Sequence, residues 1–349
     1  MRKLCGYDLS VADLAVGVPA LHTDIPRLRA GDVAGQFWSV YAPSSLPEAE
    51  AVVATLEQIE FVHRMIARYP RDFGLALTAD EVESVRNSGR IASLIGMEGG
   101  HSIASSLAVL RVMYDLGARY MTLTHNDNTA WADSATDERV LGGLSAFGEE
   151  VVREMNRLGM IVDLSHVSTD VMRQAMTTSS APVMFSHSSA RAICDVPRNV
   201  PDDVLVDLSC NGGVCMVTFV AEFVSRQVAE WSGEIVRLVE QRGGDTRSAA
   251  EFQQVALERG SSTPAPVATI DDVVAHVEHV REVAGLAHVG IGGDFDGTTM
   301  VPQGLHDVSG YPRLFDALRS SSWSENDLEL LGSSNALRVL RAVEDVSSS

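Results

Sequence analysis

The chain has 349 residues, and its 27 Lys and Arg residues against 47 Asp and Glu residues give a formal net charge of −20. Hydrophobic residues make up 45% and charged residues 21%, which is typical of a globular protein and excludes a largely disordered one. The negative charge argues against a nucleic-acid or anionic-membrane surface, because both select clusters of Lys and Arg.

The sequence shows no sign of export or membrane insertion. No apolar run approaches the roughly 18 residues needed to span a bilayer, and residues 1–5 do not lead into an apolar signal core. The four cysteines, Cys5, Cys194, Cys210 and Cys215, lack metal-finger spacing and fit a reducing compartment better than a disulfide framework. We therefore expect a cytoplasmic protein without a transmembrane segment.

Short apolar runs alternate along the chain with longer amphipathic stretches. Seven runs are predicted to be strands: 35–41, 91–97, 119–124, 160–165, 182–186, 214–219 and 288–293. The predicted helices include 47–68, 103–116, 145–158, 169–177 and 270–284. This alternation indicates βαβ units and a parallel sheet. The strands are apolar at nearly every position, as expected when both faces of the sheet are covered.

Polar groups follow five of these strands directly. They are Glu98, His125, His166, His187 and Asp294. The C-terminal strand ends of a TIM barrel converge on one face, and catalytic residues come from several of them. This pattern favours an α/β fold of the TIM (β/α)8 type over a sheet whose strand ends merely face solvent.

The strand count falls one short of a closed barrel. Seven of eight strands are recognisable, and the first strand is apparently absent, because 14–18 is followed at once by Pro19 and makes a poor strand. Residues 1–349 are predicted to form one barrel domain. Within it, 241–266 is a polar surface excursion and 323–349 forms C-terminal helices.

Glu98, His166 and His187 form a candidate transition-metal site. Carboxylate and imidazole are ligands that zinc accepts in open, catalytic sites. Each histidine follows a serine, and Asp163 lies nearby in the sequence, so hydroxyl and carboxylate groups are available to orient the ligands. A single histidine at a strand end is more often a hydrogen-bonded core residue. Three such residues at equivalent strand ends favour a metal.

Six segments together resemble the membrane dipeptidase (renal dipeptidase) family of zinc peptidases, M19, and its bacterial members in particular. They are MEGGHS (97–102), RYMTLTHNDNTAWAD (119–133), DLSHVS (163–168), FSHSSAR (185–191), PRNVPDD (197–203) and GIGGDFDG (290–297). The resemblance extends over essentially the whole chain. It implies a barrel that carries two zinc ions per subunit and hydrolyses dipeptides with a metal-activated water, in subunits that commonly form homodimers.

The resemblance also implies individual roles at the matching positions. Glu98 would bridge the two zinc ions, and His166 and His187 would hold the second. His125 would contact the substrate near the scissile carbonyl, and Arg198 would hold the free carboxylate. Asp294 would be the acid/base group. Alternatives remain for two of these residues, because Arg198 could be a surface ion-pair partner and Asp294 could cap the following turn.

The family holds its first zinc with a His-x-Asp motif on the first strand, and no matching segment exists here. We therefore expect the first zinc site to be incomplete. His22 and Asp24 have the right spacing, but their setting matches a helix start, with Thr23 as the expected N-cap. If the first site is truly missing, an alternative is a non-catalytic or impaired barrel that binds a peptide-like ligand. Lactam or lactone opening on the same centre is a further possibility.

Other motifs in the sequence give little evidence of a function. The segment 290–297 lacks the third glycine of a dinucleotide fingerprint, and 143–147 fails the serine-hydrolase pattern at its last position. His276 and His279 lie on a predicted amphipathic helix, where we expect a solvated face.

Overall fold

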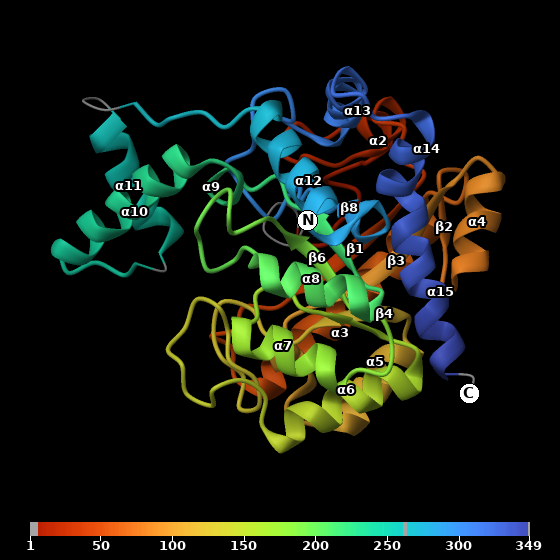
Figure 1. Cartoon of the computed structure of the whole chain (residues 1–349). Coiled ribbons are helices and arrows are strands. Elements are labelled where there is room, and N and C mark those ends of the chain that lie inside the picture. The colour runs from red at the N-terminus through yellow and green to blue at the C-terminus, as the bar shows by residue number, and fades with distance from the viewer. Residues whose placement is uncertain (1–5, 247, 261–263, 348–349) are drawn as a thin grey trace.

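The computed structural model describes residues 6–246, 248–260 and 264–347 (Figure 1). The strands are β1 (Gly35–Tyr41), β2 (Phe73–Leu75), β3 (Ile91–Glu98), β4 (Ala118–Thr122), β5 (Ile161–Asp163), β6 (Met184–Ser188), β7 (Val214–Val217) and β8 (Val289–Ile291). All pairings between these strands are parallel, and the sheet order is β1-β3-β4-β5-β6-β7-β8. The seven strands in this series are those predicted from the sequence. The short β2, which pairs with the first half of β3, was not predicted.

Most of the helices cover the outside of this curved sheet. The α-helices are α2 (Ile25–Ala30), α3 (Glu48–Arg68), α4 (Ala79–Asn87), α5 (Leu107–Asp115), α6 (Ala146–Leu158), α7 (Thr169–Thr178), α8 (Asp202–Asn211), α9 (Ala221–Val224), α10 (Arg226–Gln241), α11 (Ala249–Gly260), α12 (Ile270–Ala284), α13 (Tyr311–Ser320), α14 (Glu325–Glu329) and α15 (Asn335–Ser347). The arrangement is an α/β half-barrel, in which no pairing joins β8 back to β1 within the described residues.

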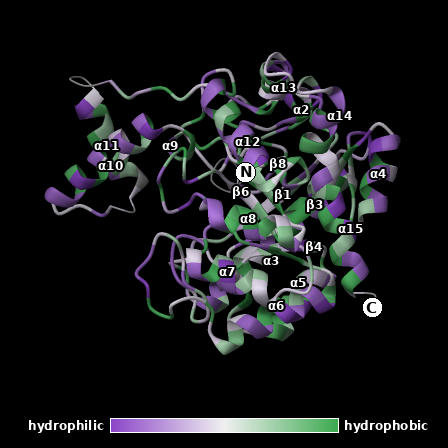
Figure 2. Ribbon diagram, in the orientation of Figure 1, coloured by the Kyte–Doolittle hydropathy of each residue, from purple (hydrophilic) through white to green (hydrophobic). Residues whose placement is uncertain are grey.

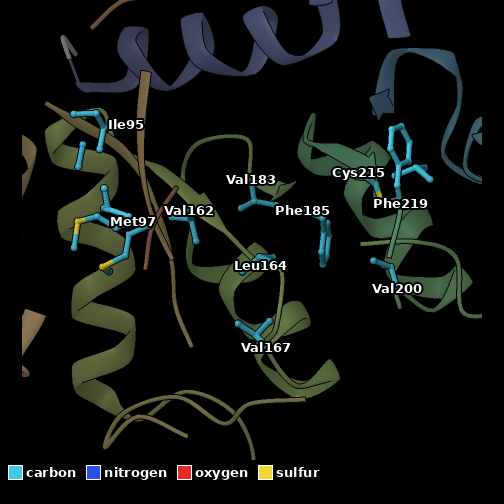
Figure 3. Close-up of a cluster of buried hydrophobic side chains, with 14 of the residues drawn as sticks. Ile95, Met97, Val162, Leu164, Val167, Val183, Phe185, Val200, Cys215 and Phe219 are labelled. Atoms are coloured by element: carbon cyan, nitrogen blue, oxygen red, sulfur yellow. The ribbon is translucent and has the colours of Figure 1, made fainter. Parts of the chain in front are cut away.

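Alternate residues of the strands enter two different cores. On β3, Ile95 and Met97 point into the layer between sheet and outer helices, where Phe185 also lies (Figure 3). Ala92 and Leu94 enter a smaller cluster inside the barrel instead. Because side chains alternate along a strand, Glu98 continues the interior set and emerges at the C-terminal end.

The helix α15 packs against the interior cluster through one apolar stripe. Val339, Leu340 and Val343 are buried against it, and the exposed side of the helix is polar (Figure 2). The helices α10 and α11 form a projecting pair with a small core of their own around Trp231 and Ile235 (Figure 1). The assignment of 1–349 to one domain stays a prediction. No helix among the described residues is long and apolar enough to cross a bilayer.

One expected helix start is wrong in detail. Asp24, and not Thr23, is the N-cap of α2, where its side chain accepts a hydrogen bond from the Arg27 backbone N–H at 3.0 Å. The Asp24 carboxylate also pairs with the Arg27 guanidinium at 2.5 Å, which a threonine hydroxyl could not match. Both residues are good N-caps, so the ion pair decides between them.

Candidate metal centre

The three predicted ligands meet at the C-terminal end of the sheet. Oε1 of Glu98 lies 3.3 Å from Nε2 of His166 and 3.4 Å from Nε2 of His187. The two imidazole Nε2 atoms are 2.9 Å apart. Each of these residues offers one ligand atom to a common centre.

These separations test whether a metal ion fits. In a tetrahedral zinc site with bonds of about 2.0–2.1 Å, neighbouring ligand atoms are about 3.3–3.4 Å apart. The two distances that involve Glu98 agree with that value, and the distance between the imidazoles is shorter. The residues present therefore fit a zinc-sized cation that accepts one carboxylate oxygen and two imidazole nitrogens.

The backbone turns sharply at two of the three ligands, whereas His187 lies within β6. Gly99, directly after Glu98, has φ 117°, and a Cβ there would lie 2.3 Å from the His101 ring. His166 has φ 69° and lies in the left-handed region, which costs a residue with a Cβ free energy. Its carbonyl oxygen accepts a hydrogen bond from the Ala135 N–H at 2.7 Å, which holds this turn in place.

His187 is held by the polar cluster that the sequence suggested. Ser186 Oγ lies 2.8 Å from Nδ1 of His187 and 2.6 Å from Oδ2 of Asp163. Ser165 Oγ accepts a hydrogen bond from the His187 backbone N–H at 2.9 Å. The imidazole Nδ1 of His166, in contrast, is buried without a hydrogen-bond partner among the described residues.

The electrostatics of the cluster favour a positive charge at its centre. Burial opposes ionisation of Glu98, but hydrogen bonds from His125, His166 and His187 hold the pKa of its carboxyl well below the usual range. Burial and the positive charge of Arg198 keep the pKa of His166 well below its usual value. His187 differs: burial lowers its pKa, but Asp294 and Glu98 outweigh burial and leave it raised.

His125 and Asp294 lie beside these ligands. Nε2 of His125 is 3.5 Å from Oε1 of Glu98, and its ring stacks on His166 with centroids 4.2 Å apart. The ring of Tyr41, the last residue of β1, also packs against His125, with centroids 4.4 Å apart. Asp294 follows β8 with φ 54°, and burial raises the pKa of its carboxyl to about 6.

Arg198 is buried, so its interpretation as a surface ion-pair partner is wrong. It is 3% exposed and donates to the His187 carbonyl at 3.2 Å and to Ser188 Oγ at 3.4 Å. Its guanidinium lies over the Phe223 ring at 5.2 Å, and burial lowers its pKa to about 10. The Nε of Arg198 is buried without a hydrogen-bond partner among the described residues, which leaves a donor for a ligand.

A cavity of about 1680 Å³ joins these groups. Its lining includes Tyr41, Glu98, His125, Arg198, Phe223 and Asp294. Sequence reasoning missed two of them. Tyr41 ends a predicted strand and follows the same rule as the predicted ligands, but no motif marks Phe223.

Two other histidines take different places from the metal ligands. His22 accepts a hydrogen bond at Nδ1 from the Asp296 backbone N–H at 3.0 Å, and it lies outside the ligand cluster. The expectation that His276 lies on a solvated face is wrong, because its ring is fully buried. Nδ1 of His276 accepts from the Ala190 N–H at 3.0 Å, and its Nε2 lies 3.1 Å from the Val224 carbonyl oxygen.

The comparison with known proteins agrees with this geometry. The sequence model of one family, described as membrane dipeptidase (Peptidase family M19), matches residues 7–349. The chain belongs to the membrane dipeptidase family. Dipeptidase 3 of Mus musculus is 42% identical over 329 residues, which cover 93% of this chain and 58% of the mouse protein. An uncharacterized dipeptidase of Schizosaccharomyces pombe is also 42% identical, over 98% of this chain and 78% of its own length.

Two solved structures share the architecture. A metallopeptidase from Rhodobacter sphaeroides, solved with a phosphinate mimic of the dipeptide L-Ala-D-Ala, has a TM-score of 0.78 and 25% sequence identity. The alignment covers 94% of this chain and 92% of that one. The probable dipeptidase PvdM from Pseudomonas aeruginosa reaches a TM-score of 0.84 at 23% identity, over 93% and 90% of the two chains, which supports the shared fold.

Proposed function

We propose that this protein is a metal-dependent dipeptidase. The observation that carries the proposal is the convergence of Glu98, His166 and His187 on one centre at the end of the sheet. The names of its relatives support the same activity. The matched region spans only 58% of the mouse relative, so we infer the activity of this chain from its own site as well as from the name of that relative. The intact ligand cluster favours catalysis over a barrel that only binds a peptide.

Zinc is the proposed metal, held by Glu98, His166 and His187. When bound, zinc polarises a carbonyl group and lowers the pKa of a water molecule so that hydroxide is available near neutral pH. The three described ligands account for one ion. The second zinc and its His-x-Asp ligands follow from the family resemblance alone, as does Glu98 as a bridge.

Arg198 is proposed to bind the free carboxylate of the dipeptide. Its planar guanidinium can donate two parallel hydrogen bonds, and its contacts with His187 and Phe223 fix its direction. His125 is proposed to contact the scissile carbonyl oxygen, and its contacts with Glu98 and Tyr41 support this role. These two residues would orient the peptide bond over the metal ligands.

Asp294 is proposed as the acid/base group. Because burial raises its pKa to about 6, its carboxylate can take a proton from the attacking water and return it to the leaving amine near neutral pH. Its place beside His187 is reflected in the raised pKa of that imidazole.

The test compares each of several dipeptides, L-Ala-D-Ala included, with its C-terminal amide. We expect hydrolysis that a chelator abolishes and zinc restores, with a strong preference for the free carboxylate. Arg198→Lys should raise KM for the dipeptide at least about tenfold and reduce the preference of the enzyme for the dipeptide over its amide. Arg313→Lys is the matched control, because Arg313 bonds the Gly304 carbonyl far from the ligands in the chain. Zinc-loaded protein that hydrolyses no dipeptide in the panel would refute the proposal.

Homodimer formation and a cytoplasmic location stay predictions, because neither the fold nor the site bears on them.

A further inference from the structure

Asp163 receives four hydrogen bonds although it is fully buried. Its Oδ1 accepts from the backbone N–H groups of Ser165 at 3.1 Å and Ser186 at 2.8 Å. Its Oδ2 accepts from the Thr122 hydroxyl at 2.5 Å and the Ser186 hydroxyl at 2.6 Å. Hydroxyl-to-oxygen distances of 2.5–2.7 Å are typical of bonds to an ionised carboxylate.

These contacts determine where the proton of Ser186 points. A carboxylate can only accept, and a serine hydroxyl has one proton to donate. The proton of Ser186 must therefore point to Asp163, since otherwise two oxygen lone pairs would face each other at 2.6 Å. The Ser186 oxygen is then an acceptor towards Nδ1 of His187, 2.8 Å away.

We propose that Asp163 and Ser186 act as a positioning pair that holds the His187 imidazole with its proton on Nδ1 and its Nε2 lone pair free for a metal ion. The proposal rests on the proposed metal site and names the residues that prepare one of its ligands. A ring nitrogen can bind a metal only when it carries no proton, so the hydrogen bond at one nitrogen selects the other as the ligand. Asp163 and Ser186 are positioning residues and touch neither metal nor substrate.

The two histidine ligands are prepared differently. Nδ1 of His166 has no partner among the described residues, and this ring is held by stacking on His125 and by the contacts of its Nε2 with Glu98 and His187. The pair therefore acts on His187 alone. Ser165 gives a control, because its hydroxyl lies in the same cluster and contacts the His187 backbone N–H at 2.9 Å and Ser186 Oγ at 3.4 Å, but not the ring.

The first experiment measures zinc affinity by competition with a chelating dye. We expect Ser186→Ala to weaken binding about 10–100-fold, as for other groups that orient a metal-ligating histidine. Ser186→Thr, which keeps the hydroxyl, should restore most of the affinity, and Ser165→Ala should cost much less than Ser186→Ala. Equal losses in Ser165→Ala and Ser186→Ala would overturn the pair, because the effect would then be general packing.

A sharper test reverses the direction of the pair. In Asp163→Asn the amide oxygen can stay opposite the two backbone N–H groups, which places the amide NH₂ towards Ser186. The NH₂ donates to Ser186, the Ser186 proton turns to Nδ1 of His187, and the ring proton moves to Nε2, where zinc must bind. We expect Asp163→Asn to weaken zinc binding when Ser186 is present. In protein that already carries Ser186→Ala, adding Asp163→Asn should weaken zinc binding further by less than about threefold. Independent, additive losses would contradict the proposal.

The tautomer itself can be read without metal. The ¹⁵N shifts of His187 in zinc-free protein at alkaline pH should show the proton on Nδ1 in the wild type and on Nε2 in Asp163→Asn. A wild-type proton on Nε2 would refute the positioning pair even if zinc binds well. Conversely, a wild-type protein with the expected tautomer but no affinity for zinc would refute the proposed function and leave the pair intact.

Discussion

The buried His276 should make the protein sensitive to mild acid. Its ring lies on α12, where Nδ1 accepts from the Ala190 N–H, so Nε2 carries the proton and donates to the Val224 carbonyl. Protonation would place a second N–H against the Ala190 donor in a site without water access. Burial accordingly lowers the pKa of His276 to about 4.

The magnitude follows from the difference between the folded and unfolded states. The unfolded chain binds this proton at a pKa near 6.5, and the folded protein only near 4, so the contribution of His276 is complete above 6.5. It is lost as the pH falls from 6.5 to 4, and the full loss is about 3 kcal/mol. Between pH 7.5 and pH 5.0 the expected loss is about 2 kcal/mol.

The measurement is urea unfolding of wild type and His276→Gln at both pH values. Glutamine offers an acceptor and a donor but does not titrate, so the stability difference between the two proteins should shift by about 2 kcal/mol in favour of the variant at pH 5.0. His306→Gln, at an exposed position, controls for loss of an imidazole without burial. If the stability difference between wild type and His276→Gln changes by less than about 0.5 kcal/mol between the two pH values, the reasoning is refuted, because a change of that size is within the usual deviation from additivity of unrelated sites.

Three further substitutions test the site and its supports. Asp294→Asn should lower kcat about 10²–10⁴-fold while zinc affinity is retained. Single-turnover assays and a zinc titration would measure the two quantities, and an unchanged kcat would exclude Asp294 as the acid/base group. Asp133→Ala removes a buried carboxylate that accepts several backbone N–H bonds from 140–143. It should cost about 2–3 kcal/mol in urea unfolding, and a loss below about 0.5 kcal/mol would contradict that anchoring role. Gly292→Ala places a Cβ 1.9 Å from the Ser186 carbonyl oxygen, so thermal unfolding should show a clear loss of stability. A wild-type Tm would mean that the segments around Gly292 and Ser186 move apart at little cost.

The strands and the ligands were predictable because their signals are local. Gly35–Tyr41 is rich in aromatic residues, and its predicted bounds match the observed strand. Glu98, His166 and His187 could be grouped because parallel strands all end on the same face, so a rule about strand ends is also a rule about space. The three residues of β2, Phe73–Leu75, are too short to show a period, and pairing with β3 alone makes them a strand.

The burial of His276 could not be predicted, because it is decided by distant segments. Its own helix, α12, has Asp271, Asp272 and Arg281 on its surface and reads as a solvated amphipathic helix. The groups that cover the ring come from Ala190 after β6 and Val224 at the end of α9, both more than fifty residues away. The alternative that Arg198 is a surface ion-pair partner is wrong for the same reason, since Phe223 and His187 enclose it from other elements.

The position of Asp163 links strand alignment to ligand placement. Its one side chain ties the end of β5 to Thr122 on β4 and to Ser186 on β6. A slip of either neighbouring strand by one residue would therefore break these bonds and turn a ligand away at the same time. The three strands therefore reach their correct alignment and form the ion-binding site together. A misaligned chain would be detectable because it would not retain the ion.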